Sequence, residues 1–185
     1  MTTEQKLPDQ QLRDTAQLVA GLMRDVPDFP APGVLFKDFT PLLADGAALR
    51  RLVDDVARRY RGRCDVVVGM EARGFILGAA VAYALEVGFV PVRKAGKLPG
   101  GTVSVDYTLE YASATLEMHA DALHPGQRVL VLDDVLATGG TAAATCRLVE
   151  ECGAVVAACE FVVEIDALGG RSQLAGREVT SLVHA

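Results

Sequence analysis

Apolar residues recur at helical spacing in four segments of the chain, 10–26, 46–60, 74–86 and 140–153. The second segment is the clearest, because its apolar residues form one stripe and its charged residues occupy the opposite face, as in an amphipathic helix. The first predicts a helix that ends before Pro27. The third is apolar nearly all round, which predicts a buried helix.

Short β-branched runs alternate with these helices. The runs 64–70, 88–96 and 154–165 are mostly apolar, as is the beginning of 129–141, whereas 177–183 is more polar. Continuous apolar runs are typical of parallel strands that are buried on both faces. The pattern therefore predicts an α/β fold, with a mostly parallel twisted sheet flanked by helices.

Two segments depart from this alternation. The segment 27–43 contains four prolines and predicts an ordered loop rather than a helix. Its aromatic residues indicate that it packs on other parts of the chain; they are Phe29, Phe36 and Phe39. Further on, apolar residues alternate in 103–107 and 114–118, which predicts an antiparallel pair of strands.

Length and charge narrow the class of protein. The chain has 185 residues, which suits a single domain over 1–185, and a net charge of −6 that disfavours nucleic acid as a partner. No apolar run is long enough for a membrane helix, and the first ten residues contain no apolar signal segment. The four cysteines form no CxxC pair and the three histidines are scattered, so we expect a cytoplasmic protein without a zinc site.

The segment VLVLDDVLATGGT, residues 129–141, carries the candidate chemistry. Asp133 and Asp134 stand at the end of a buried strand, and Thr138 to Thr141 form the turn into the next helix. Ligands of parallel sheets bind at this end of the strands, and a glycine-rich helix start attracts phosphate. A phosphate joined to a diol would satisfy both the turn and the carboxylates, and ribose 5-phosphate has that shape.

This segment does not match two other phosphate-binding motifs. A P-loop requires a lysine after its last glycine, but Thr141 follows Gly140, and the GxGxxG motif of dinucleotide-binding folds is absent. An ordinary capped helix start with two solvated aspartates would also fit the glycines. The combination of two acids and two threonines around the turn favours the binding site.

These residues also carry a family resemblance. VLVLDDVLATGGT resembles the phosphoribosyl-pyrophosphate signature of the type I phosphoribosyltransferases. DFPAPGVLFKDFTPLL, EARGF, RKAGKLPG and YTLEY are similar to segments of the adenine-specific members, from about Asp28 to the last strand. The resemblance implies the type I phosphoribosyltransferase fold, with a small N-terminal hood within 1–45 and a mobile β flap over 95–120.

The implied activity is that of a pentosyltransferase of purine salvage. Adenine and 5-phosphoribosyl 1-pyrophosphate would give AMP and pyrophosphate, with Mg²⁺ as cofactor and a homodimer as the assembly. The Mg²⁺ would be held through the diphosphate, with Asp133 and Asp134 as candidate protein ligands.

The resemblance also assigns roles to individual residues. The 5′-phosphate would be held by Ala137, Thr138, Gly139, Gly140 and Thr141, and the ribose hydroxyls by Asp133 and Asp134. Pyrophosphate would be bound by Arg73, Arg93, Lys94 and Lys97, with Arg93 reaching the site of the neighbouring subunit. A cis peptide bond that does not involve proline is expected near Glu71–Ala72.

The remaining roles concern the base. Glu110 would be the catalytic acid that protonates or hydrogen-bonds N7 of adenine, and Tyr111 would order the flap and the sugar. Phe36 would stack on the adenine ring while backbone groups of Leu35 and Lys37 read its edge. Arginine is common in the family at the position of Lys37.

Two alternatives remain open from the sequence. A sister enzyme would use hypoxanthine, guanine or xanthine, although the proline-rich segment argues for adenine. A regulator that senses phosphoribosyl pyrophosphate would share the fold, but the acidic net charge and the lack of a basic stripe argue against it.

Overall fold

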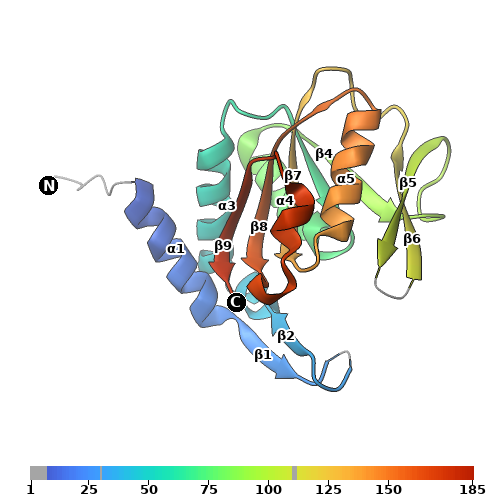
Figure 1. The fold of residues 1–185 in the computed structure, drawn as a ribbon. Helices are drawn as coiled ribbons and strands as arrows, with labels where there is room; N and C mark the ends of the chain where they lie inside the picture. Colours follow the sequence, from blue (N-terminus) through green and yellow to red (C-terminus); the bar gives the residue numbers. More distant parts are fainter. Residues whose placement is uncertain (1–7, 30, 110–111) are drawn as a thin grey trace, which may run out of the picture. The chain divides into compact units, whose positions relative to one another are not determined.

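The computed structural model describes residues 8–29, 31–109 and 112–185. The chain divides into two compact units, residues 1–56 and 57–185. The larger unit contains the central sheet, and the course of the chain through each unit can be followed by colour in Figure 1.

A seven-stranded sheet forms the larger unit, in the order β5-β6-β4-β3-β7-β8-β9. Its parallel strands are β3 (Val66–Met70), β4 (Gly88–Lys94), β7 (Arg128–Leu136), β8 (Val155–Glu164) and β9 (Val179–His184). The antiparallel strands β5 (Thr102–Leu109) and β6 (Ala112–His119) pair with each other, and β6 pairs with β4. The predicted mostly parallel sheet and the predicted antiparallel pair are both confirmed.

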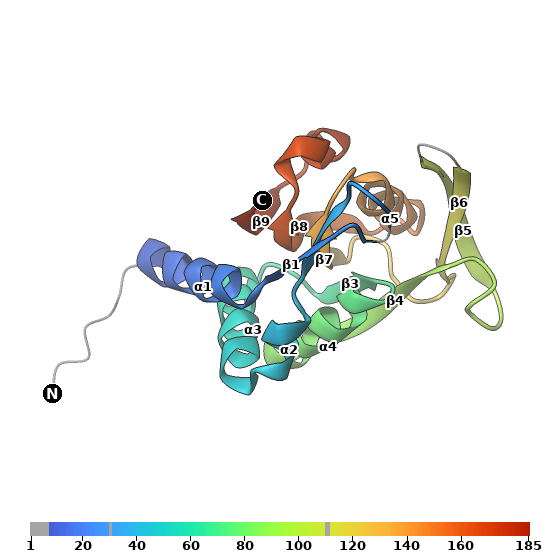
Figure 2. The same cartoon turned by 90° about the horizontal axis from the view of Figure 1, so that it is seen from below.

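Helices cover both faces of this sheet. In Figure 2, α4 (Arg73–Leu85) and α5 (Gly140–Glu151) lie on opposite sides of β3 and β7. From β3 the chain passes through α4 to β4, and from β7 it passes through α5 to β8 on the other side of the sheet. The connections after β3 and β7 thus diverge, and such a divergence leaves a crevice at the carboxyl ends of the two strands.

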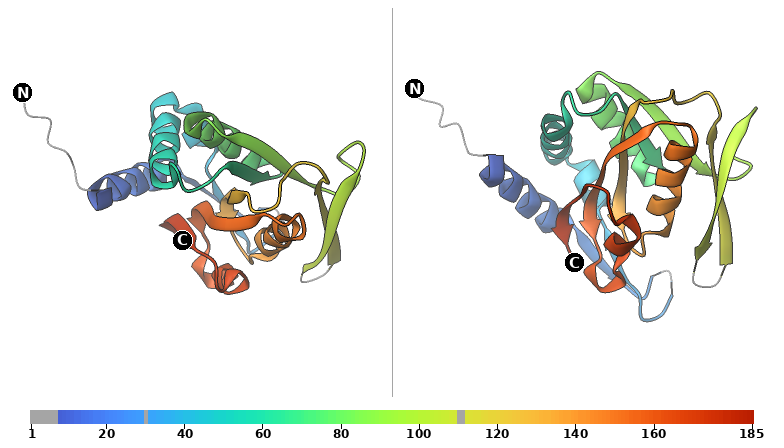
Figure 3. Two further views of the ribbon diagram at one scale, coloured as in Figure 1. Left: turned by 90° about the horizontal axis from the view of Figure 1, so that it is seen from above. Right: turned by 45° about the horizontal axis from the view of Figure 1, so that its top comes forward.

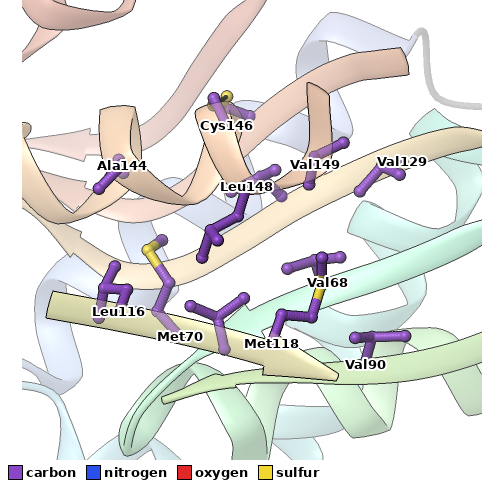
Figure 4. Packing of buried hydrophobic residues seen from close by; sticks show 14 of the residues in the cluster. Val68, Met70, Val90, Leu116, Met118, Val129, Ala144, Cys146, Leu148 and Val149 are labelled. Atoms are coloured by element: carbon purple, nitrogen blue, oxygen red, sulfur yellow. Dashed lines mark hydrogen bonds between the residues drawn. The ribbon is translucent and has the colours of Figure 1, made fainter. Parts of the chain in front are cut away.

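The core between α5 and the sheet follows the period of two along each strand. Val66, Val68 and Met70 of β3 belong to it, together with Leu116 and Met118 of β6, and all five side chains are buried. Figure 4 shows four of these residues facing Leu148 and Val149 of α5, namely Val68, Met70, Leu116 and Met118. Burying each such side chain contributes about 1.5–3 kcal/mol.

Two charged pairs fix strand positions in the larger unit. Glu160 of β8 is buried and accepts hydrogen bonds from Arg59 at 2.6 Å and from the Tyr60 hydroxyl at 2.7 Å. Asp65 accepts from the Arg128 backbone N–H at 2.8 Å and from its guanidinium at 2.6 Å. These contacts join segments that are 63 to 101 residues apart in the chain.

The smaller unit contains α1 (Pro8–Leu22), β1 (Arg24–Pro27), β2 (Leu35–Asp38) and α2 (Thr40–Ala44), and α3 (Gly46–Tyr60) extends from it into the larger unit. β1 and β2 are antiparallel, with Arg24 opposite Asp38, and the two side chains form an ion pair at 2.6 Å. Thr15 of α1 donates a hydrogen bond to Asp55 of α3.

The expected helix over 46–60 is confirmed, but the smaller unit corrects two other predictions. The helix predicted over 10–26 ends at Leu22, because the residues from Arg24 pair with β2 instead. The predicted loop 27–43 includes β2 and the start of α2, where a proline in the first turn is tolerated. Phe39 is fully buried, as its aromatic character suggested, whereas Phe29 is half exposed.

The connection between β8 and β9 holds two short 3₁₀ helices that the sequence pattern did not indicate, η1 (Asp166–Leu168) and η2 (Gly170–Leu174). None of the helices in the described part of the chain is long and apolar enough to cross a membrane.

Candidate active site

The loop 137–141 joins the carboxyl end of β7 to the start of α5. Gly139 is the N-cap residue of α5 and has φ +82°, a left-handed conformation that glycine adopts without steric cost. No side chain caps this helix start, so its first backbone N–H groups remain available to a ligand. The loop lines an open pocket of about 90 Å³ together with Met70, Asp133 and Phe161.

Two carboxylates lie beside this loop. Asp134 is buried, and its Oδ2 lies 2.9 Å from Nε of Arg73 in an ion pair. Asp133 is partly buried and lines the pocket. Burial, and next the charge of Asp134, raises the pKa of Asp133 well above its ordinary value. The pair therefore favours a ligand that brings hydrogen-bond donors or positive charge.

The loop after β3 brings Arg73 to the same place. The Glu71–Ala72 peptide bond is cis, as expected from the family resemblance. Arg73 begins α4, and Gly74 packs directly on Asp133, since a Cβ atom at Gly74 would lie 2.7 Å from Oδ1 of that aspartate. The positive end of the α4 dipole thus faces the Asp133 carboxylate.

The other predicted pyrophosphate ligands are Arg93 and Lys94 of β4 and Lys97 of the turn that follows it. Arg93 forms an ion pair with Glu71 at 3.1 Å and donates to the Lys97 carbonyl at 3.0 Å. Lys94 and Lys97 have exposed side chains. The turn that carries Lys97 is held by Glu117 of β6, which accepts the backbone N–H of Lys97 at 2.8 Å.

The β5–β6 hairpin lies along α5 at the edge of the sheet (Figure 3). The Tyr107 hydroxyl of β5 lies 3.4 Å from Oγ1 of Thr141, so the hairpin contacts the loop 137–141 directly. Arg147 of α5 donates to the Asp106 carbonyl at 2.9 Å. Glu110 and Tyr111, the predicted catalytic acid and its neighbour, lie outside the described residues.

The predicted base-binding residues lie on β2 of the smaller unit. Leu35 is half exposed, and Phe36 packs edge-to-face on Phe29 with ring centroids 5.1 Å apart. Lys37 forms an ion pair with Asp25 of β1 at 2.8 Å, so its side chain already has a partner within the hairpin.

The structure brings Arg73, Asp133, Asp134 and the loop 137–141 together at one end of the sheet, with Arg93 tied to the same region through Glu71. Sequence reasoning missed Glu71, Tyr107 and Glu117 as supports of this site. Glu117 could have been noticed as a charged residue between two inward-facing apolar ones, but its partners are set only by the fold.

Fold and site together define a phosphoribosyltransferase. The sheet diverges at β3 and β7, an uncapped helix start follows β7, and two carboxylates adjoin it. The model of the phosphoribosyl transferase domain family matches residues 40–173 of the chain.

Similar proteins show which phosphoribosyltransferases this chain resembles most in sequence and structure. An adenine phosphoribosyltransferase of Methylococcus capsulatus is 60% identical over 163 residues, which cover 88% of this chain and 95% of that protein. A crystal structure of adenine phosphoribosyltransferase from Thermoanaerobacter pseudethanolicus is 46% identical, with a TM-score of 0.89 and coverage of 92% and 99%. The enzyme from Saccharomyces cerevisiae, solved with an imino-altritol bisphosphate and adenine, is 40% identical, with a TM-score of 0.88 and coverage of 91% and 98%. The chain belongs to the adenine phosphoribosyltransferase family.

Proposed function

We propose that this protein joins adenine to 5-phosphoribosyl 1-pyrophosphate, giving AMP and pyrophosphate in purine salvage. The observation that carries the proposal is the arrangement around Asp134, where a helix start without a side-chain cap, two carboxylates and Arg73 adjoin. The membership of the chain in the adenine phosphoribosyltransferase family supports adenine as the base.

The sugar substrate is held by its phosphate and its hydroxyls. The backbone N–H groups of the loop 137–141 receive the 5′-phosphate, and the hydroxyls of Thr138 and Thr141 add donors. Asp133 and Asp134 accept hydrogen bonds from the 2′- and 3′-hydroxyls. Their negative charge also lies where positive charge develops on the sugar as the bond to pyrophosphate breaks.

The pyrophosphate leaving group is bound by cations. Arg73, Arg93, Lys94 and Lys97 stabilise its charge, and Arg93 also serves the site of the second subunit. Among the described residues Oδ2 of Asp134 has no aligned hydrogen bond besides its ion pair with Arg73, and carboxylate oxygens are ligands that Mg²⁺ prefers. Asp133 and Asp134 therefore fit the cofactor, and Mg²⁺ bound with the diphosphate would neutralise charge on the leaving group.

Two sets of residues are assigned to the base. Phe36 stacks on the adenine ring, and the backbone groups of Leu35 and Lys37 read its hydrogen-bonding edge. Because Lys37 is already paired with Asp25, the lysine that replaces the usual arginine leaves this backbone recognition unchanged. Glu110 donates a proton or hydrogen bond to N7, which withdraws electrons from the purine, and Tyr111 orders the flap over the sugar.

The active assembly is a homodimer in the cytoplasm. Helix α4 has no charged residue from Gly74 to Leu85, yet Ile76 is 50% and Tyr83 88% exposed. An exposed apolar stripe on a helix is suited to cover by a second copy of the chain. The cysteines are free, as expected in a reducing compartment.

A competition assay tests the proposed function. Purified protein with labelled phosphoribosyl pyrophosphate and Mg²⁺ is offered equal amounts of adenine, hypoxanthine, guanine and xanthine. We expect AMP as the dominant product. Comparable IMP formation would instead identify the 6-oxopurine enzyme, and tight binding of phosphoribosyl pyrophosphate without any product would identify a regulator.

A further inference from the structure

The loop 137–141 rests on a second loop that the proposed reaction does not use. This second loop is the η1–η2 segment, residues 166–174, which lies beside the start of α5 in Figure 1. The closest approach is between backbones. A Cβ atom at Gly170 would lie 2.1 Å from the Ala137 carbonyl oxygen and 2.9 Å from the Gly139 nitrogen.

The contact is equally tight when seen from the other side. A Cβ atom at Gly139 would lie 2.3 Å from the Gly170 carbonyl oxygen. Real Cβ atoms essentially never come closer than 3.0 Å to such atoms. Neither position can therefore carry a side chain unless one of the two loops moves.

Two adjacent glycines are required for different reasons: Gly169, the N-cap residue of η2, and Gly170, its first residue. Gly169 has φ +61° and no atom within 4 Å of a Cβ placed there, so only its backbone conformation requires glycine. Gly170 is buried, and its φ lies outside the left-handed region. Only the close approach to Ala137 and Gly139 explains a glycine at position 170.

The η1–η2 segment is anchored at both ends, so it cannot easily move away from the loop 137–141. Its entry is fixed by the Ile165 backbone N–H, which donates to the Leu136 carbonyl at 2.9 Å. Arg171 donates to Glu164 at 3.0 Å and to the Val179 carbonyl at 2.8 Å. Leu174 is fully buried in the core at its end. A group inserted at position 170 would therefore displace the loop 137–141.

We propose that Gly170 is a positioning residue for phosphate binding. Its backbone sets the path of Ala137 to Gly139, and so holds the N–H groups of that loop at the spacing that a phosphate monoester requires. This inference rests on the proposed function, in which the loop 137–141 binds the 5′-phosphate.

The test compares Gly170→Ala with Gly169→Ala and measures the affinities of ribose 5-phosphate and of pyrophosphate by calorimetry. We expect Gly170→Ala to weaken the affinity for ribose 5-phosphate at least tenfold and the affinity for pyrophosphate less than twofold. The same substitution should raise KM for phosphoribosyl pyrophosphate more than it lowers kcat. Gly169→Ala should keep both affinities and lower only the melting temperature.

Other outcomes overturn the inference. Ribose 5-phosphate binding within twofold of wild type in Gly170→Ala, or equal loss of both ligands, would show that Gly170 does not position the phosphate loop. If wild-type protein itself fails to bind ribose 5-phosphate, the proposed function of the loop is wrong.

A second variant keeps the inference testable if Gly170→Ala does not fold. Arg171→Ala removes one anchor of the segment without adding atoms, and the Arg171 side chain is 44% exposed. We expect Arg171→Ala to lower the affinity for ribose 5-phosphate threefold or more and to leave the affinity for pyrophosphate unchanged. Unchanged affinity for both ligands would refute the positioning role.

Discussion

Nε of Arg73 lies 2.9 Å from Oδ2 of Asp134, so the first residue of α4 is paired with a carboxylate at the end of β7. The two residues are 61 positions apart in the chain. This ion pair joins the loop proposed to bind pyrophosphate to the carboxylates proposed to bind ribose, so the two sets of candidate ligands lie at one end of the sheet.

Asp134→Ala should cripple binding of the sugar substrate. A hydrogen bond to a charged group contributes about 1.5–3 kcal/mol, so KM for phosphoribosyl pyrophosphate should rise about 10- to 100-fold. Steady-state kinetics at saturating adenine measure this change. Asp121→Asn, at an exposed acid in the turn after β6, is the control, and equal effects of the two variants would exclude Asp134 from the site.

Glu110→Gln and Glu110→Leu should slow turnover more than they weaken affinity for phosphoribosyl pyrophosphate. General acid catalysis typically contributes about 10²-fold or more to a rate, so we expect a loss of that size in kcat. Pre-steady-state and binding measurements separate the two effects. Unchanged kinetics in both variants would remove Glu110 from the mechanism.

Tyr107→Phe should disturb the loop 137–141 through Thr141. The hydroxyl contact at 3.4 Å is lost, and a hydrogen bond of this kind contributes about 0.5–1.5 kcal/mol. We expect KM for phosphoribosyl pyrophosphate to rise by up to about tenfold. Ser104→Ala, which removes the hydroxyl of an exposed residue of the same strand, should have no such effect.

Ile76→Glu combined with Tyr83→Glu should convert the proposed dimer to a monomer. Charged groups introduced into an apolar interface must be desolvated without a partner. Light scattering coupled to size exclusion measures the mass. Val155→Glu places the same charge on an exposed apolar residue of β8 and should leave the mass unchanged. A dimer that survives the double substitution would place the interface elsewhere.

Asp65 should make stability depend on pH at the acidic end. Hydrogen bonds from the Arg128 guanidinium and backbone lower the pKa of Asp65 to about 2, from an ordinary value of 3.8. A carboxyl with a lowered pKa stabilises the folded state above its unfolded pKa and loses that contribution as the pH falls through the folded pKa. The contribution of Asp65 should therefore be complete above pH 4 and fade towards pH 2.

The measurement is the free energy of unfolding of wild type and of Asp65→Asn across that range. Asp65→Asn should be less stable at pH 7, and the difference should shrink between about pH 4 and 2. Asp54→Asn, at an exposed position of α3, serves as the control. A difference that stays constant over this range would contradict the role of the Asp65–Arg128 pair.

Local patterns predicted the regular elements from residue 46 onward well. The helix over 46–60 has the predicted bounds, and β7 is followed by the predicted glycine turn. By contrast, β1 and β2 have four residues each, and the pairing of Arg24 with Asp38 depends on a partner 14 positions away. A strand this short carries no alternation by which it could be recognised.

The sequence by itself determined the sheet-and-helix order and the glycine turn of the loop 137–141 with its neighbouring acids, because those signals lie in residues close along the chain. Tertiary structure alone decided which distant groups complete the site. Three contacts join separate elements in this way. They are the Arg73–Asp134 ion pair, the hydrogen bond from the Lys97 backbone to Glu117, and the contact of Gly170 with Ala137. Such contacts depend on strand order and packing, and neither is encoded in any one stretch of residues.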